Sequence, residues 1–439
     1  MGKYLILTML LFSLDRLAAE VLSFSDLYQL SLRNSRDIKS YEFQTESQQE
    51  LVKQAKSKLY PKINFASYYK ISDQQLNSTY SFNTDQRIKQ TLNSNTISIE
   101  QLIYDKSVYS GISIEEMKSE LSRMELELKK QELAQELFKV YLDILKSKNK
   151  IDYHRYYLQY TESKLKAIEK KYKLNLANKM DFLEANVDKN SAIVNLNKED
   201  QVFNLNRLKL SRYIGGTEFD LPKVFSDSLS MQHLEIIKNH ILDDGANISA
   251  GLRLNQARLT MEMRKLEVER AYDTYYPTLG MSASYSQYDT DTPTTDSQYD
   301  VSQQLMINLK LPLYSGGYLS STLSQAKLAL MAANETFLSE QEQAALIYDE
   351  LLLKFNSAIE TIQIYNGAIE SAKLYVKALE QGYNHQLRSI IELEEAKSKL
   401  AQVEYQYIDS LYEMIDAYIG LLILTNKFDN IYLLDDLIT

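Results

Sequence analysis

The chain has 439 residues, and its net charge of −10 excludes the basic surface that a nucleic-acid partner requires. It contains no cysteine, which excludes disulfides, thiolate metal sites and a lipid anchor on an N-terminal cysteine. Glycine and proline are scarce, at 12 and 5 residues, and this indicates long uninterrupted elements.

The N-terminus has the pattern of an export signal. An apolar run from Tyr4 to Leu14 follows Lys3, and Ala18-Ala19 supply small residues for cleavage, so residues 1–19 are predicted to be a signal peptide. A buried N-terminal helix is the other interpretation. The run is too short to span a bilayer, and no other segment is long and apolar enough for a membrane helix. An exported chain of this kind can still enter a membrane as a β-barrel.

The first repeat, residues 20–216, reads as a helix, two strands and long helices. The strands are predicted at about 62–71 and 95–104, where apolar residues occupy alternate positions on either side of a polar stretch. The leading helix is interrupted near Asn34-Ser35. Gly215-Gly216 ends the last helix, because glycine readily adopts the left-handed conformation of a helix C-terminus.

The second repeat, residues 247–425, follows the same plan, with strands predicted at about 278–288 and 301–313. Residues 217–246 lie between the repeats without a counterpart, and residues 426–439 form a tail. A duplicated unit of two strands and long helices narrows the possible architectures to very few.

The strands of the two repeats match residue by residue. Ile63, Phe65, Ser67 and Tyr69 align with Leu279, Met281, Ala283 and Tyr285, and Ile97 and Ile99 align with Ile307 and Leu309. Period-two alternation gives each strand one apolar and one polar face. In a membrane, the odd-numbered residues are predicted to face lipid and the even-numbered ones water.

The long helices have the heptad pattern of coiled coils, with apolar or small residues at steps of three and four. A helix of some 65 residues is about 100 Å long, so these helices predict a rod. The seam of the first repeat is thinner because several of its positions are small or polar. The predicted seams include Phe355, Ala358, Ile362, Leu379, Leu393, Ala396, Ser410, Met414, Ala417 and Leu421, and in the first repeat Ile144, Ser147, Ile151, His154 and Thr161.

Four strands cannot close a barrel, and an open sheet edge in lipid leaves backbone groups unsatisfied at several kcal/mol each. Closed barrels need about eight strands or more. Several chains must therefore combine their strands, or the strands never enter a membrane. A small soluble sheet covered by helices is the alternative.

Several motifs together resemble those of TolC-like outer-membrane efflux proteins, over essentially the whole mature chain. They are the segment Leu311-Pro312-Leu313-Tyr314-Ser315-Gly316-Gly317, Tyr276-Pro277 before the third strand, and the helix starts Asp181–Ala185 and Glu392–Ala396. The resemblance implies an α+β membrane protein in which a homotrimer forms a 12-stranded β-barrel continued by a coiled-coil α-helical barrel. It also implies that residues 217–246 and 426–439 form an equatorial belt.

The resemblance further implies a location in the outer membrane, in contact with its lipid and extending into the periplasm. The partners would be a periplasmic adaptor and an inner-membrane transporter of an efflux pump or type I secretion system. The chain departs from the family pattern at Lys106-Ser107, where the second repeat has Gly316-Gly317. It also has Asn175 and Gln386 where the family favours glycine, and glutamine tolerates a left-handed conformation less well than asparagine.

A polar cluster follows the second helix break, and the resemblance assigns it to a periplasmic gate. Glu392 and Glu395 match inward carboxylates that narrow the tunnel, while Tyr383, Arg388 and Asp181 match groups that tie neighbouring helices together. The alternative is that these acids only stabilise a helix start, where the dipole favours them by about 0.3–1 kcal/mol.

Glu100, Asn308 and Lys310 lie on the polar faces of their strands and are candidates for the barrel lumen. A position of Glu100 and Lys310 at the membrane rim is the alternative. No enzyme is predicted: the four histidines show no metal-ligand spacing, and no glycine loop or nucleophile motif for a cofactor or substrate is present. His154 is predicted to be a hydrogen-bonded packing residue.

The sequence therefore predicts a passive outer-membrane channel that needs no cofactor or metal. A periplasmic coiled-coil adaptor or structural rod without a pore is the alternative function.

Overall fold

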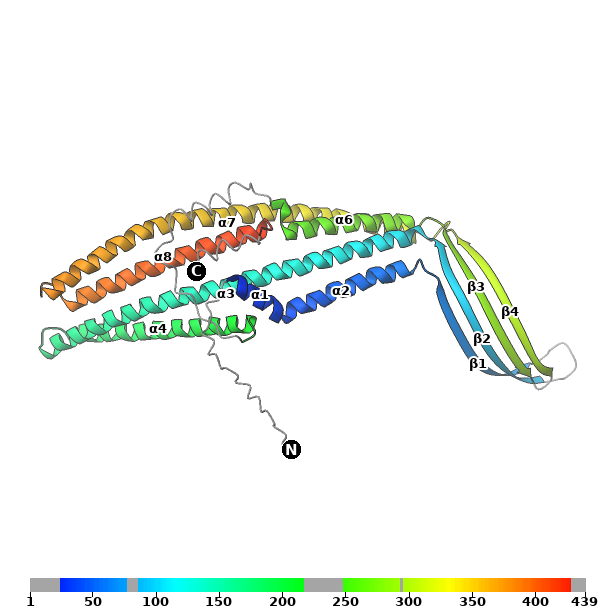
Figure 1. Cartoon of the computed structure of the whole chain (residues 1–439), viewed down its shortest axis with the longest axis horizontal. Helices are drawn as coiled ribbons and strands as arrows, with labels where there is room; N and C mark the ends of the chain where they lie inside the picture. Colours follow the sequence, from blue (N-terminus) through cyan, green and yellow to red (C-terminus); the bar gives the residue numbers. More distant parts are fainter. Residues whose placement is uncertain (1–23, 77–85, 217–247, 293–294, 428–439) are drawn as a thin grey trace, which may run out of the picture. The chain divides into compact units, whose positions relative to one another are not determined.

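The computed structural model of the chain describes residues 24–76, 86–216, 248–292 and 295–427 (Figure 1). The predicted signal peptide 1–19, the inter-repeat segment 217–246 and residues 428–439 of the predicted tail lie outside the described residues. The chain divides into two compact units, one of residues 1–38, 128–252 and 343–439, the other of residues 39–127 and 253–342.

The order of elements repeats along the chain, as the sequence predicted. The first repeat has α1 (Phe24–Asn34), α2 (Arg36–Ser57), β1 (Lys62–Leu76), β2 (Gln86–Tyr104), α3 (Lys106–Lys173) and α4 (Lys179–Tyr213). The second has η1 (Ile248–Ala250), α6 (Leu252–Asp273), β3 (Thr278–Thr292), β4 (Thr295–Lys310), α7 (Tyr318–Asn384) and α8 (Ile390–Leu424). Among the described residues, none of the helices is both long and apolar enough to cross a bilayer.

The break between α1 and α2 lies where the sequence predicted it. The Ser35 N–H still donates to the Ser31 carbonyl at 2.8 Å, while the Ser35 hydroxyl accepts from the Ile38 N–H at 3.2 Å. Serine satisfies one of the free N–H groups of a new helix start in this way, so Ser35 ends one helix and begins the next.

The four strands form one antiparallel sheet in the order β1-β2-β3-β4, within the second unit (Figure 1). Odd-numbered residues face odd-numbered ones across every ladder, as in the pairs Phe65–Ile97, Ile97–Tyr285 and Met281–Ile307. The register shifts once between β2 and β3, between Leu102 and Tyr104, which brings Tyr104 opposite Leu279. One face of the sheet therefore collects the apolar residues of both repeats.

The strands are longer than the sequence predicted at their hairpin ends. β1 runs to residue 76 and β3 to residue 292, and β2 and β4 begin at residues 86 and 295. Much of the polar sequence expected as loop is therefore paired strand, because ladder hydrogen bonds join backbone groups whatever the side chains are. At its other end β4 stops at Lys310, before Pro312, which has no N–H for a ladder.

The main core lies in the first unit and joins α1, α3, α4, α7 and α8. Its largest fully buried side chains include Phe138, Tyr141, Phe355 and Tyr418, and the rings of Phe355 and Tyr418 lie 6.4 Å apart. The predicted seams are confirmed where their residues are buried. These are Phe355, Ala358, Ile362, Leu379, Leu393, Ala396, Ser410, Met414, Ala417 and Leu421, with Ile144, Ser147, Ile151 and Thr161 in α3.

Candidate functional site: the sheet faces, the helix turns and their junction

The two faces of the sheet differ in chemistry and in crowding. The odd-numbered face is apolar and open, with Ile63 69% and Phe65 68% exposed. On the even-numbered face Ser94 and Ser286 are buried, and the Thr96 and Ser286 hydroxyls lie 2.9 Å apart. Crowded small polar side chains on one face and open apolar ones on the other are what a sheet curved around a polar interior produces.

The three predicted lumen residues share the polar face. Glu100 lies opposite Lys62 of β1 and Ser282 of β3, so its opposite-charge neighbour in the ladder is Lys62 and not Lys310. Lys310 lies opposite Thr278, and Asn308 lies opposite Gly280. The polar face thus has opposite charges side by side at the end of the sheet nearest the helices.

Exposed tyrosines border the apolar face at both ends. Tyr69 and Tyr285 lie midway along β1 and β3, beside the polar outer half of the sheet, and Tyr299 lies toward the hairpin end of β4. Tyr60, Tyr104, Tyr276 and Tyr314 lie where the strands meet helices. A tyrosine ring is apolar and its hydroxyl needs a wet partner, so the residue suits a boundary between lipid and water. The apolar band with its two tyrosine borders has the surface pattern of a transmembrane strand segment.

The turns α3–α4 and α7–α8 have the same construction in both repeats. Asn175 and Gln386 adopt positive φ values of 58° and 62°. The Leu176 N–H donates to the Lys171 carbonyl, and the Leu387 N–H donates to the Gly382 carbonyl, each at 2.8 Å. This is the Schellman ending of a helix, and glutamine adopts it here as asparagine does.

Each following helix starts with a capping box. In α4 the Asn178 side chain accepts from the Asp181 N–H while the Asp181 carboxylate accepts from the Asn178 N–H. Ser389 and Glu392 do the same in α8, where the Ser389 N–H lies 2.8 Å from Glu392 Oε2. This hydrogen bond is the main reason that the pKa of Glu392 lies below its ordinary value.

The structure places the predicted gate residues on these turns and brings only some of them together. Arg388 pairs with Glu392 at 3.4 Å, and Glu395 pairs with Lys399 at 2.7 Å. Among the described residues, Asp181 contacts neither Arg388 nor Tyr383, the latter lying partly exposed in the last turn of α7. Within one chain Glu392 and Asp181 therefore occupy equivalent capping positions at the starts of α8 and α4.

Sequence reasoning missed two residues of the second turn. Ser389 with Glu392 is a readable capping-box pattern, and Gly382 leaves room for the Arg388 stem. A Cβ on Gly382 would lie 2.7 Å from Arg388 Cγ, so Arg388 folds back over the last turn of α7 only because this residue is glycine.

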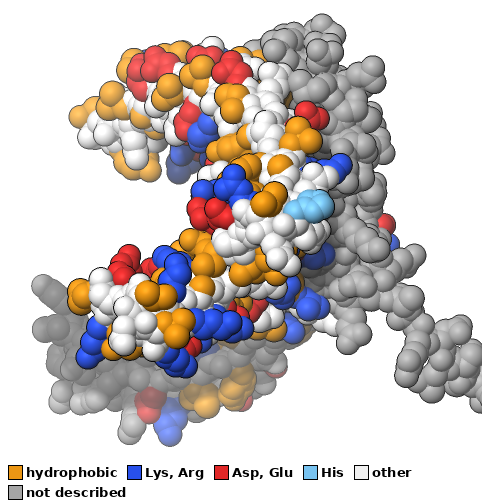
Figure 2. Space-filling model, turned by 90° about the vertical axis from the view of Figure 1, so that its left-hand side faces the viewer, with side chains coloured by type: hydrophobic (Ala, Val, Ile, Leu, Met, Phe, Trp, Pro, Cys, Tyr) orange, Lys and Arg blue, Asp and Glu red, His pale blue; other side chains and the backbone are white. Residues whose placement is uncertain are grey.

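Figure 2 looks onto the end of the first unit that carries these turns, where charged and hydrophobic side chains are interspersed. Lysines gather at the α3–α4 turn, which contributes Lys170, Lys171 and Lys173. Leu174 and Leu176 lie exposed beside them, and Leu387 is exposed at the α7–α8 turn. Exposed leucines rimmed by charge are typical of a surface that contacts another protein.

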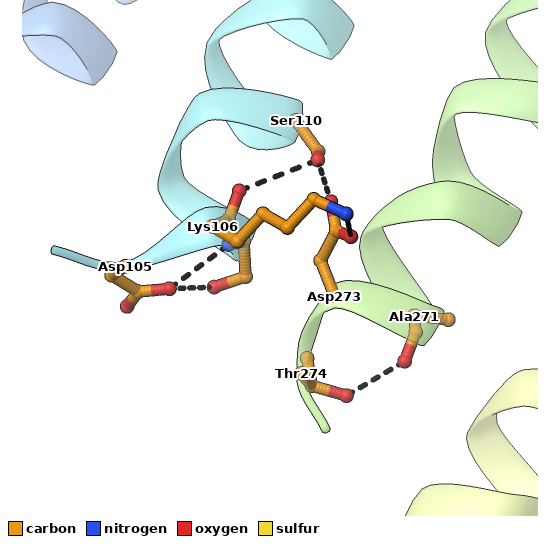
Figure 3. A network of polar contacts seen from close by, with 7 residues as sticks. Asp105, Lys106, Ser110, Ala271, Asp273 and Thr274 are labelled. Carbon is orange, nitrogen blue, oxygen red and sulfur yellow. Dashed lines mark hydrogen bonds and ion pairs between the residues drawn. The ribbon is translucent and has the colours of Figure 1, made fainter. Parts of the chain in front are cut away.

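A further polar network joins the repeats where strands meet helices (Figure 3). Lys106 Nζ lies 2.9 Å from Asp273 Oδ1, the Ser110 hydroxyl donates to the same carboxylate, and Lys106 lies 4.3 Å from the centre of the Tyr276 ring. The hydrogen bond to Asp273 raises the pKa of Lys106 above its ordinary value. Asp105 caps α3 by accepting from the Ser107 N–H at 2.9 Å.

Metal and histidine chemistry have little support in the part of the chain that the structure describes. No group of three or more histidine or acidic side chains there is placed to hold a metal ion. Burial lowers the pKa of His154, and its Nδ1 has no hydrogen-bond partner among the described residues. If His154 makes the predicted hydrogen bond, Nδ1 is not the atom that makes it.

A strand hairpin joined to long paired helices, repeated twice along the chain, defines a class of outer-membrane channel subunits. Comparison with known proteins agrees with this assignment. The family model for outer membrane efflux proteins matches residues 27–216 and 251–427, so the chain belongs to that family. This membership places it in the outer membrane, as predicted, and among the outer membrane efflux proteins.

Among curated relatives, the chain is similar to the outer membrane protein TolC of Salmonella enteritidis, with 28% identity over 199 residues. TolC of Escherichia coli K12 is 27% identical over 174 residues. These matches span 41% and 36% of this chain but only 40% and 35% of the relatives.

Among solved structures, VceC of Vibrio cholerae has a TM-score of 0.71 at 14% identity, covering 92% of this chain and 96% of VceC. The CmeC outer membrane channel of Campylobacter jejuni has a TM-score of 0.67 at 12% identity, covering 92% and 86%. The predicted α+β fold class with two internal repeats is confirmed by this likeness.

Proposed function

We propose that three copies of this chain combine their sheets into one 12-stranded barrel and form the exit duct of a tripartite efflux pump or type I secretion system. The observation that supports this most is the sheet itself, which has one apolar face, one polar face and free edges on β1 and β4. An open edge in lipid is costly, and pairing β4 of one copy with β1 of the next removes every edge.

The helices support the same assembly. On α4 the residues Met180, Val187, Val194 and Leu208 lie exposed at multiples of seven, and on α7 Leu346, Leu353 and Leu374 do so. An exposed heptad seam is half of a coiled-coil interface. Two such seams on one unit suit a ring in which α4 of one copy packs against α7 of the next.

The duct is proposed to be passive, because the sequence has no phosphate-binding glycine loop, and to work with a periplasmic adaptor and an inner-membrane transporter. Glu100, Asn308 and Lys310 would line the lumen on the polar face. Glu392 and Glu395 would form carboxylate rings at the narrow periplasmic end, with Arg388, Tyr383 and Asp181 holding neighbouring helices closed. The leucines and lysines of the two turns suit contact with the adaptor.

Crosslinking or native mass spectrometry of the detergent-purified protein tests the assembly. Trimers are expected, because three sheets of four strands give a closed barrel with a lumen. A monodisperse monomer with its full β-structure would contradict the proposal. After carbonate washing, the protein should stay with the outer membrane, whereas a pore-free periplasmic rod would be released.

A further inference from the structure

The ion pair between Lys106 and Asp273 is unusual in both burial and position. The Asp273 side chain is only 6% exposed, whereas that of Lys106 is 44% exposed. Asp273 is the last residue of α6 and Lys106 the first of α3, so each charge lies at the helix end that its own dipole disfavours. Each therefore depends on the other, and the buried carboxylate depends on Lys106 and Ser110 for its partners.

The pair joins the first repeat to the second where β2 meets β3. The sequence provides no equivalent pair for the proposed contact between β4 and β1 of another copy. When the Tyr-Pro motifs and strand ends of the repeats are aligned, Ser57 takes the place of Asp273 and Gly316 that of Lys106. Ser320, the equivalent of Ser110, donates instead to the Gly317 carbonyl at 2.8 Å. Both charges therefore meet only where β2 pairs with β3.

This asymmetry matters because the two hairpins are otherwise alike. In the proposed ring of copies, β2 pairs with β3 of the same chain, and β4 pairs with β1 of the next chain. The matched apolar faces would equally allow β2 to pair with β1 of another copy and β4 to pair with β3. Pairing β2 with β1 of another copy would place Lys106 beside Ser57. Pairing β4 with β3 of another copy would bury Asp273 beside Gly316, with no cation as its partner.

We propose that the Lys106–Asp273 pair determines the order of the hairpins around the ring. Every arrangement that places a hairpin next to a copy of itself leaves one of these two charges without its partner, and is therefore less stable. The inference rests on the proposed ring of copies. A buried charge that is satisfied in one arrangement and stranded in the others discriminates through the wrong pairing as much as through the right one. The same pair then holds β2–α3 and α6–β3 together at the end of the ladder, next to the register shift at Leu102.

The test uses cysteine reporters, because the chain has no cysteine of its own. Ser98 and Ser284 are direct partners in the β2–β3 ladder, so Ser98→Cys with Ser284→Cys should crosslink within one chain. Tyr68 is the equivalent of Ser284 in the first repeat, and Ser98→Cys with Tyr68→Cys should crosslink between chains only where β2 meets β1 of another copy. Both reporters are read in the membrane-assembled protein.

The double substitution Lys106→Gly with Asp273→Ser gives the β2–β3 junction the residues of the equivalent positions in the other repeat, Gly316 and Ser57. We expect it to lower the Ser98–Ser284 crosslink severalfold and to produce the Ser98–Tyr68 dimer. The swap Lys106→Asp with Asp273→Lys should restore the parental pattern. As a matched control, Lys56→Met with Glu116→Gln removes a half-exposed 2.7 Å pair inside the first repeat and should change neither crosslink.

If the glycine–serine variant forms trimers with a full Ser98–Ser284 crosslink and merely melts at a lower temperature, the pair is only structural and the inference is overturned. If the unaltered chain forms no trimer at all, the proposed function fails together with it. Native mass spectrometry of the same samples separates these two results.

Discussion

Ser389 and Asn178 each hold the first turn of a long helix after a Schellman turn. Replacing Ser389 with alanine should destabilise the start of α8 by about 1 kcal/mol, because an N–H of the first turn loses its acceptor. Hydrogen exchange of the amides of residues 390–393 measures this. Ser371→Ala is the matched control, since the Ser371 hydroxyl donates within α7 and caps nothing. Equal exchange in both variants would show that the cap has no role.

The lowered pKa of Glu392 gives the α8 start a predicted pH dependence. The folded pKa lies below the unfolded one, so the stabilisation is present above the unfolded pKa and is lost as the pH falls through the folded pKa. The protection factors of the first-turn amides, which are corrected for intrinsic exchange, should therefore fall on acidification in the parental chain. Glu392→Gln keeps the box but removes the titration, so its protection factors should not fall with the pH in this way. A parallel acid response in both proteins would exclude Glu392 as its source.

The gate proposal is tested by the same substitution, because glutamine preserves the capping box while removing the charge. Rings of Glu392 and Glu395 should attract multivalent cations, since focused negative potential raises the local concentration of counter-ions. Block of channel current by a trivalent cation added on the tip side is expected for the parental chain. It should be lost in Glu392→Gln with Glu395→Gln and kept in Glu394→Gln, a carboxylate of the same turn. Unchanged block in the double variant would leave these acids as helix-start residues only.

At the scale of elements, the strand faces make a prediction about solvent. Asn308 and Leu309 are neighbours in β4 on opposite faces, the first polar and the second apolar and exposed. In membranes, a cysteine at position 308 should react with a water-soluble thiol reagent, and one at position 309 should not. Ready reaction at 309 with protection at 308 would reverse the assignment of the two faces.

The elements were predictable from the sequence because their periods are local and repeated. Alternation placed Ile63, Ile97 and Leu309 on one face, and heptads placed Phe355 and Met414 in the core. The hairpin ends of the strands were not predictable, because the polar side chains there give no sequence signal of the backbone pairing that continues along the ladder.

The Lys106–Asp273 junction and the helix turns contain features that neighbouring residues in the sequence do not predict. Asp273 has no local signal, because its partner Lys106 arrives only through the pairing of β2 with β3. The positive φ of Gln386 runs against its own preference and is imposed by the helix-ending turn, which has the same construction as the turn at Asn175 in the other repeat. The capping box of Ser389 and Glu392, in contrast, was readable and was missed.

At the scale of the whole molecule, each part of the chain is incomplete in the same way. The sheet has two free edges, and the unit with the main core exposes apolar seams on α4 and α7. In the proposed ring, further copies of the chain would satisfy both, and the ring would surround the polar face of the sheet. The central claim is therefore that the assembled protein encloses a continuous aqueous pore.

Conductance of the purified protein in planar lipid bilayers tests this claim most directly. Because a closed barrel lined by Asn64, Ser98 and Ser284 on its even-numbered face would hold water, discrete single-channel current steps are expected. Protein that is firmly inserted in the bilayer yet passes no current above the lipid baseline, even with Arg388 and Tyr383 replaced to loosen the proposed gate, would contradict the account.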